Sequence, residues 1–419
     1  MTALVIVAAL AAAAASGLRW LRVAQREHYL PGAASRFAWR WWSTGRNPLL
    51  GLVVVAAVAT AAFEPPVGLA AAAALAVGPS GLTLAGRTSR LVWTRRLRTL
   101  AAVWAGLHLL LVAVGGAAGA GPLVALIAAV ITPVLVDIAL AVVAPVERRL
   151  AVKWVKRAAD RLRQVAPRVV AITGSYGKTT TKGYVAHLVG ATRPVVASPA
   201  SFNNLSGLAR AVNEHLTPGT EVFVAEMGTY GPGEIAELCR WFPPDIAVIC
   251  AIGPVHLERM GSEEAIVAAK AEILGSATTV VLNIDHPGLA LLADSNDAAG
   301  RRVRRCSSRS SPDAGVAVVD GRLVVDGSTV ADVAGVVDGS VHPGNLACAV
   351  AVALELGVPE AVVVERLVGL PTPPNRLTVS TAASGATVLD DTYNSNPAGT
   401  TAALAALVRH GGAGNRRVV

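Results

Sequence analysis

The sequence predicts a membrane-embedded helical region followed by an α/β domain with a mainly parallel sheet. Hydrophobic residues make up 53% of the 419 residues and charged residues only 16%, which is too apolar for an ordinary soluble protein. After residue 168, short β-branched runs alternate with amphipathic helical stretches, the pattern of a parallel sheet wrapped by helices. We therefore expect a transmembrane region over residues 1–150, a connecting helix over 151–167 and an α/β domain from residue 168.

The formal charge divides the chain in the same way. Residues 1–150 contain 13 Arg, no Lys and four acidic residues, whereas the remainder contains 24 basic and 24 acidic residues. The whole net charge of +9 thus belongs to the first third. Because these arginines lie between apolar runs, they predict contact with a lipid bilayer and argue against nucleic acid as a partner.

Five segments are candidates for membrane spans, each of which needs about 20 mostly apolar residues. They are Thr2 to Leu18, Pro48 to Phe63, Val67 to Leu84, Thr99 to Ala118, and Pro122 to Pro145. The second and third are short, so a re-entrant segment and a total of four spans stay open. Arginines follow the first and third spans, which predicts a multi-pass protein of the cytoplasmic membrane with everything after Glu147 in the cytosol. Asp137, inside the fifth span, is either a functional carboxylate or one paired with a neighbouring helix.

The four cysteines predict a reducing compartment. Cys239, Cys250, Cys306 and Cys348 lie far apart and form no CxxC pair, which argues against a zinc ribbon or a disulfide framework. Cys250 and Cys348 fall in apolar stretches and are interpreted as small core residues.

A phosphate-binding loop is predicted at the end of the first expected strand. The expected strands are Val169 to Thr173, Val195 to Ala197, Val222 to Ala225, Ile246 to Ile252 and Val280 to Ile284. The loop reads Gly174-Ser175-Tyr176-Gly177-Lys178-Thr179-Thr180-Thr181 and precedes a helical stretch. Glycines let backbone N–H groups close around phosphate oxygens, the lysine reaches the β/γ-phosphates, and the first threonine suits Mg²⁺. Ile172 stands where the six-spaced form of the motif has its first glycine, and the competing interpretation is a chance Gly-Lys-Thr turn.

This loop resembles the shortened phosphate loop of the Mur ligases, and further segments resemble that family in the same order. They are Asn203-Asn204 with Gly207, Glu226-Met227-Gly228, Ile252 to Glu258, Ala269 to Ile273, Arg376, and Asp390 to Pro397. The run Tyr393-Asn394-Ser395-Asn396-Pro397 is similar to the ligases that add D-alanyl-D-alanine. The resemblance implies a central ATP-binding domain over 168–375 and the incomplete beginning of a C-terminal ligase domain over 376–419.

The resemblance also implies ATP and two Mg²⁺ ions as cofactors. The implied metal ligands are Thr179, Glu226, His256 and Lys270, the last in the carbamylated form that the matching lysine has in this family, and the implied catalytic residues are Lys178, His256, Lys270 and Arg376. The implied nucleotide contacts are Gly174, Ser175, Gly177, Lys178, Thr179, Thr180, Asn204, Asn345, Arg376 and Asp391. Competing interpretations are a solvated strand end for Glu226, an exposed ion pair with Glu272 for Lys270, a turn former for Asn204 and a helix cap for Asn345.

The implied reaction is ATP-dependent formation of an amide bond in peptidoglycan precursor synthesis. A muramyl peptide, UDP-linked or lipid-linked, would be activated as an acyl phosphate and attacked by D-alanyl-D-alanine or a similar amine. Unless a partner supplies the rest of the C-terminal domain, the resemblance implies that these 419 residues bind nucleotide poorly and ligate nothing. The rival hypotheses are another ligase of the same superfamily, and a non-catalytic membrane scaffold that recruits cell-wall synthesis enzymes.

Overall fold

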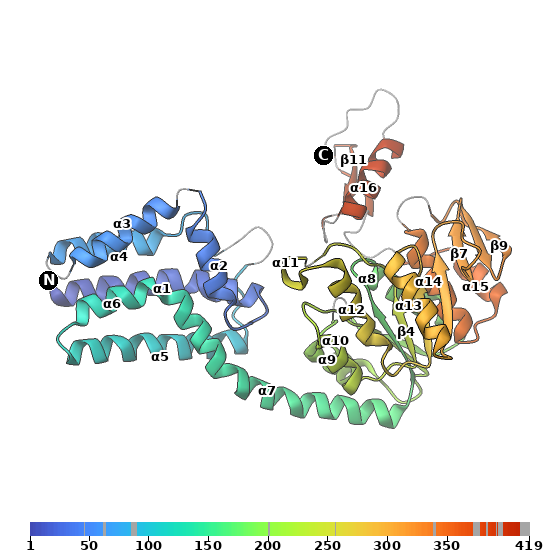
Figure 1. Ribbon diagram of the computed structural model, residues 1–419, viewed down its shortest axis with the longest axis horizontal. Helices are drawn as coiled ribbons and strands as arrows, with labels where there is room; N and C mark the ends of the chain where they lie inside the picture. The colour runs from blue at the N-terminus through green and yellow to red at the C-terminus, as the bar shows by residue number, and fades with distance from the viewer. Residues whose placement is uncertain are drawn as a thin grey trace. The chain divides into compact units, whose positions relative to one another are not determined.

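The computed structural model describes residues 1–45, 47–61, 64–84, 90–199, 202–255, 257–337, 341–371, 378–382, 384–390, 392 and 397–410 (Figure 1). The chain divides into two compact units, Met1–Leu150 and Ala151–Val419.

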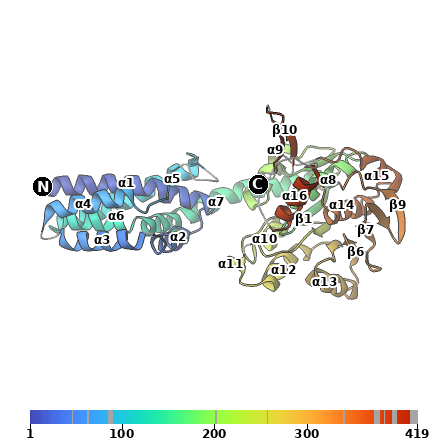
Figure 2. The same ribbon diagram turned by 90° about the horizontal axis from the view of Figure 1, so that it is seen from above.

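The first unit is built only of helices in the part that the structure describes. They are α1 (Thr2–Arg26), α2 (Ala33–Trp42), α3 (Asn47–Thr60), α4 (Pro65–Val77), α5 (Arg95–Ala117), α6 (Gly121–Val130) and the start of α7 (Thr132–Val165). The helices α1, α3, α4, α5 and α6 run side by side (Figure 2). Large apolar side chains on their outer surface, such as Leu52 and Leu109, are 68% and 59% exposed, which suits a lipid environment better than water.

Two of these helices, α1 and α5, are long and apolar enough to cross a membrane, and α6 with α7 would make a third span if the bent pair counts as one. The expected spans at Pro48 to Phe63 and Val67 to Leu84 are helices of only 14 and 13 residues. The second of them stops at Val77 because Gly78 precedes Pro79, and the residue before a proline is disfavoured in the helical conformation.

The expected fifth span, Pro122 to Pro145, is not one straight helix. A break at Ile131 separates α6 from α7, and the pair is bent by 76°. Pro133 explains the break, because its ring excludes the hydrogen bond and the space that a continuing helix needs. The expected connecting helix over 151–167 is the second half of α7.

Polar side chains join the helices of this unit. Asp137 on α7 is 8% exposed and accepts hydrogen bonds from the backbone N–H groups of Ala34 (3.2 Å) and Ser35 (2.7 Å) at the start of α2. Arg19 on α1 donates to four carbonyl oxygens at the end of α4, those of Leu75, Ala76, Val77 and Gly78. Asp137 is therefore paired with a neighbouring helix, which is what one of its two predicted interpretations expects.

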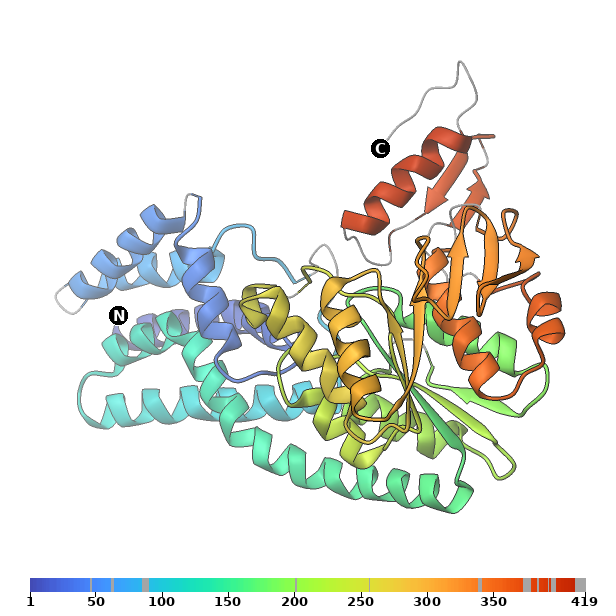
Figure 3. The same ribbon diagram turned by 45° about the vertical axis from the view of Figure 1, so that its right-hand side comes forward.

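The second unit contains a nine-stranded sheet in the order β2-β3-β1-β4-β5-β6-β7-β8-β9. The strands are β1 (Arg168–Thr173), β2 (Val195–Ala197), β3 (Val222–Glu226), β4 (Ile246–Ile249), β5 (Thr279–Asn283), β6 (Arg302–Ser307), β7 (Val316–Val319), β8 (Arg322–Val325) and β9 (Ser328–Asp332). Pairing is parallel from β2 to β7 and antiparallel from β7 to β9, which Figure 3 draws in orange. The prediction of a mainly parallel sheet, with its five strands, is confirmed.

Helices cover both faces of this sheet. One apolar core joins the sheet to α8 (Lys178–Val189), α14 (Pro343–Glu355) and α15 (Glu360–Arg366). The other joins it to the end of α7, α9 (Leu205–His215), α10 (Glu234–Trp241), the short 3-10 helix Glu272–Leu274 and α13 (Pro287–Ala298). The remaining elements are α11 (Leu257–Met260), α12 (Glu263–Ala271), the hairpin β10 (Thr378–Thr381) with β11 (Thr387–Asp390), and α16 (Pro397–His410).

Candidate functional site

The phosphate-type loop lies at the carboxyl end of β1, the strand flanked by β3 and β4. The chain leaves β1 toward β2 and β3 on one side and later returns to β4 on the other. The loop thus occupies the point at which the strand order reverses, where open α/β sheets bind their ligands.

Gly177 begins α8 in a left-handed conformation, with φ +77°. A Cβ atom there would also lie 2.2 Å from Oδ1 of Asn345, so both the backbone and the space require glycine. The side chain of Asn345 therefore lies against the loop, although it belongs to α14. The N-cap of that helix is His342, whose Nδ1 accepts from the N–H of Gly344 (3.2 Å), and not Asn345.

Ser175 fixes the loop to the segment that follows β4. Its N–H donates to the carbonyl of Ala251 (2.7 Å), and its hydroxyl donates to the carbonyl of Gly253 and accepts from the same residue's N–H, both at 3.0 Å. Lys178 folds over the loop and donates from Nζ to the carbonyl oxygen of Gly174 (2.7 Å). Thr180 is buried on α8.

Glu226, the last residue of β3, is 1% exposed, and its carboxylate interacts with three polar side chains. Its Oε2 accepts from the Thr179 hydroxyl and forms an ion pair with Lys182 Nζ, each at 3.0 Å. Its Oε1 accepts from the amide of Asn203 (3.1 Å). The interpretation of Glu226 as a solvated strand end is therefore wrong.

Two of these partners were not among the predicted site residues. Asn203 reaches Glu226, whereas Asn204 caps α9 by accepting from the N–H of Gly207 (2.9 Å). Lys182 lies four residues after Lys178 on α8, which begins at the loop. This spacing of about one helical turn puts both lysines on the same face and could have indicated Lys182 as a site residue.

Lys270 lies near the end of α12 and is 3% exposed. Burial, with a smaller contribution from the nearby Lys178 ammonium, lowers the pKa of Lys270 to about 7. Glu272 does not pair with it in an exposed position. Instead the Glu272 carboxylate accepts from the N–H groups of Gly233 (2.6 Å) and Ala236 (3.0 Å) at the start of α10.

The donor atoms near the loop fit a divalent cation. Mg²⁺ prefers carboxylate and hydroxyl oxygens, and Glu226 and Thr179 present one of each within 3.0 Å of one another. Within the described ranges, no group of three or more His, Cys, Asp or Glu residues could hold a metal ion by itself. His256, Arg376 and Asp391 of the predicted site, and the run from Tyr393 to Asn396, lie outside the described residues.

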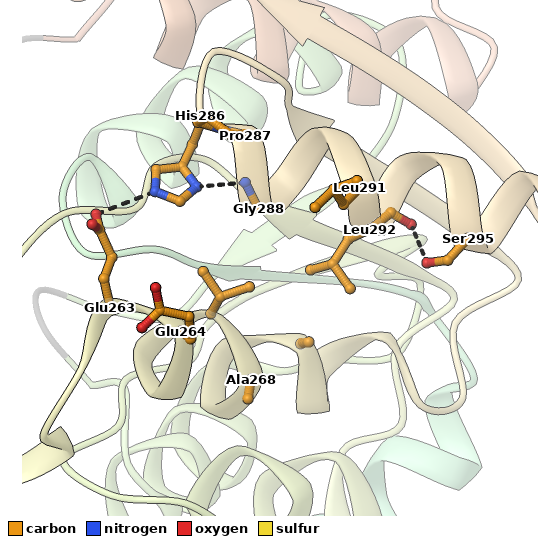
Figure 4. A pocket seen from close by; sticks show the side chains of 11 residues that line it. Glu263, Glu264, Ala268, His286, Pro287, Gly288, Leu291, Leu292 and Ser295 are labelled. Carbon is orange, nitrogen blue, oxygen red and sulfur yellow. Dashed lines mark hydrogen bonds and ion pairs between the residues drawn. The ribbon is translucent and has the colours of Figure 1, made fainter.

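A groove of about 720 Å³ lies between α12 and α13 (Figure 4). Its lining is largely apolar and includes Leu291 and Leu292 of α13, and His286 at one end contacts Glu263 at 3.2 Å. None of the predicted site residues lines this groove. The candidate site is therefore the loop with Glu226 and Lys270, not this groove.

The fold and the loop define an α/β domain with a phosphate-type loop at the switch point of its sheet. Residues 172–323 match the family model described as the Mur ligase middle domain, and this part of the chain is such a domain.

Curated relatives and solved structures extend this likeness. A UDP-N-acetylmuramoyl-tripeptide--D-alanyl-D-alanine ligase of Mycobacterium leprae is 37% identical over 271 residues, which cover 58% of this chain and 51% of the relative. MurF from Acinetobacter baumannii superposes with a TM-score of 0.54 at 25% identity, over 62% of this chain and 58% of that one. MurF ligase from Thermotoga maritima in complex with ADP gives 0.50 at 28% identity, over 62% and 61%. The chain spans about half the length of the curated relatives it matches.

Proposed function

We propose that the chain is part of an ATP-dependent amide-bond ligase of peptidoglycan precursor synthesis, attached to the cytoplasmic membrane with its catalytic unit in the cytosol. It joins D-alanyl-D-alanine or a similar amine to a muramyl peptide. The observation that carries the proposal is the phosphate-type loop with Glu226 buried beside Thr179. These substrates are supported by the relatives, which are named UDP-N-acetylmuramoyl-tripeptide--D-alanyl-D-alanine ligases.

In this proposal the chain's own residues position ATP and neutralise charge. The loop N–H groups and the start of α8 hold the phosphates, and Lys178 moves from the Gly174 carbonyl to the terminal phosphate oxygens. An anionic carboxylate can then attack the γ-phosphate, giving an acyl phosphate and ADP. The amine attacks the acyl carbon, and inorganic phosphate leaves.

Thr179 and Glu226 would hold one Mg²⁺, which supplies Lewis-acid stabilisation of the phosphate oxygens. Lys270 supports the proposal differently. A lysine must be neutral to react with CO₂, and its lowered pKa provides the neutral amine near physiological pH. The carbamate so formed is an anion, and with His256 it would complete a second metal site.

The test uses membranes in which the chain is expressed together with the rest of a C-terminal ligase domain, because the 419 residues span about half the length of the curated relatives. ADP release is measured with muramyl tripeptide and D-alanyl-D-alanine together and with each omitted, for the wild type, Lys178→Ala and the exposed-surface control Arg322→Ala. We expect release that requires both substrates, is lost in Lys178→Ala and persists in the control. Nucleotide binding without turnover in the wild type would reject the ligase in favour of a scaffold.

The acceptor is tested in the same membranes. The muramyl peptide is offered as the UDP-linked form and as a lipid-linked form. The helical unit by itself favours neither the UDP-linked nor the lipid-linked acceptor. The ratio of the ADP release rates with the two forms therefore assigns the acceptor.

Lys270 is tested by labelling with ¹³C-bicarbonate and NMR. We expect a carbamate signal that grows as the pH rises through about 7 and is absent in Lys270→Met. A signal that persists in the variant would assign it to another amine.

A further inference from the structure

The second half of α7 has two unlike faces. Val155, Ala158 and Leu162 belong to the apolar core of the second unit. Arg161 donates to the carbonyl of Leu216 (2.6 Å), and the amide of Asn213 donates to the carbonyl of Trp154 (3.1 Å). This half of the helix is therefore firmly joined to the body of the α/β unit.

The opposite face is basic. Lys153, Lys156 and Arg157 are exposed there, and with Asp160, Arg161 and Gln164 they line a groove of about 550 Å³. Their spacing of three and four residues places them on one side of a helix, turned away from Val155 and Ala158. We call Lys153, Lys156 and Arg157 the basic face.

Charge in the second unit is segregated onto this helix. Residues 151–165 contain five basic residues and one acidic residue, a net +4, whereas residues 166–419 contain 19 basic and 23 acidic residues, a net −4. An anionic surface would therefore attract α7 and repel the remainder of the unit, which fixes an orientation as well as an attachment.

Aromatic and apolar side chains accompany the basic face. Trp154 is 57% exposed and lies under the Arg157 guanidinium, 5.7 Å from the ring centroid, and Val152 is 48% exposed. Tryptophan beside basic residues, just after an apolar helical stretch, is the composition of a membrane interface and not of an ordinary solvated helix. A purely electrostatic partner would not require these exposed apolar groups.

We propose that the basic face of α7 binds the headgroups of anionic phospholipids and holds the catalytic unit against the membrane in one orientation. The inference rests on the proposed membrane attachment and goes beyond it, because attachment alone would leave the unit free to turn. Near an anionic leaflet, each basic residue strengthens such binding by roughly fivefold.

The experiment places a spin label at Trp154→Cys in the full chain, reconstituted in nanodiscs of phosphatidylcholine alone or with about one third phosphatidylglycerol. The four native cysteines are buried and do not compete for the label. Accessibility to a water-soluble nickel complex and to oxygen is measured by electron paramagnetic resonance. A label at Thr329→Cys, on the acidic part of the unit, is the control position.

We expect the label at position 154 to lose nickel accessibility and gain oxygen accessibility only in the anionic discs, while position 329 stays exposed in both. Lys153→Gln/Lys156→Gln should abolish the difference, whereas Arg309→Gln/Arg322→Gln, with the same change of charge, should keep it. Equal accessibility in both lipids, or equal loss in the two double variants, would overturn the proposal.

A label at Leu109→Cys on α5 tests the membrane attachment separately from the lipid contact of the basic face. If position 109 contacts lipid while position 154 does not respond, the basic face is not a lipid site although the attachment stands. If position 109 is exposed to water, the membrane attachment itself fails and the inference falls with it. None of these readings depends on ATP turnover, so loss of ligase activity is a separate result.

Discussion

At the scale of single residues, Gly177 is the most constrained position of the candidate site. Gly177→Ala must place a Cβ in a left-handed backbone, at about 1–2 kcal/mol, and must also displace Asn345. We expect a larger loss of unfolding free energy than in Gly219→Ala, where φ is +88° but no atom lies within 4 Å of the added Cβ. Urea denaturation of both variants measures the difference, and equal losses would show that Asn345 does not press on the loop.

Lys270 predicts a pH dependence of stability. Its folded pKa of about 7 lies below the ordinary 10.5, so between these values the unfolded chain binds a proton that the folded chain does not. Wild-type stability therefore decreases as the pH falls through this window, and the penalty is complete below pH 7.

The measurement is the melting temperature of Lys270→Met relative to wild type in CO₂-free buffer at about pH 6 and about pH 10. We expect the variant's advantage to be larger at the lower pH. Lys153→Met, at an exposed position, should show the same difference at both values. An advantage for Lys270→Met that is independent of pH would contradict the lowered pKa.

The site was predictable where the signal is local. The order of strand, glycine loop and helix depends on neighbouring residues, and the structure has this order, with Gly177 as the N-cap of α8 and Lys178 and Thr179 in its first turn. The choice between Asn203 and Asn204 was not predictable, because two adjacent asparagines differ only in which side chain the tertiary structure turns toward Glu226. The same holds for Lys270, whose burial depends on elements distant in sequence.

At the scale of elements, α2 depends on a cap from another helix. Asp137 satisfies two N–H groups at its start, so Asp137→Ala should leave them without an acceptor at a cost of about 1–2 kcal/mol. We expect faster amide hydrogen exchange at Ala34 and Ser35, with a smaller effect in Asp137→Asn, which keeps an acceptor oxygen. Unchanged exchange in Asp137→Ala would reopen a functional role for this carboxylate.

The sequence pattern predicted some of the strands and helices of the chain but not all of their ends. Buried parallel strands read as β-branched runs, and all five expected strands are present at their predicted places. Hydropathy located α1, α3, α4, α5 and the α6–α7 pair but not the amphipathic α2. It also missed helix ends, since it does not register the Gly78-Pro79 and Pro133 breaks. The antiparallel β7–β9 depends on pairing across turns and was not predicted.

At the scale of the whole molecule, the four cysteines are a probe of global integrity. All four are buried and free, and burial raises the pKa of Cys239 and Cys250 to about 12. Thiolate is the reactive form, so we expect no reaction with Ellman's reagent in the native chain and four thiols after denaturation. A thiol that reacts without unfolding would reveal a local opening of the α/β unit.

The hydrogen bonds from Arg19 to the end of α4 join a helix that is synthesised early to a helix that is synthesised later. The α3–α4 hairpin is short for a bilayer, and its last carbonyl groups are satisfied by a side chain of α1. During translation α1 leaves the ribosome before this hairpin does, so the guanidinium is already available when the hairpin emerges. Helix α1 is therefore synthesised before the carbonyl groups that its Arg19 satisfies, and a circular permutation that moved α1 behind α4 would leave these carbonyl groups without that donor until α1 followed.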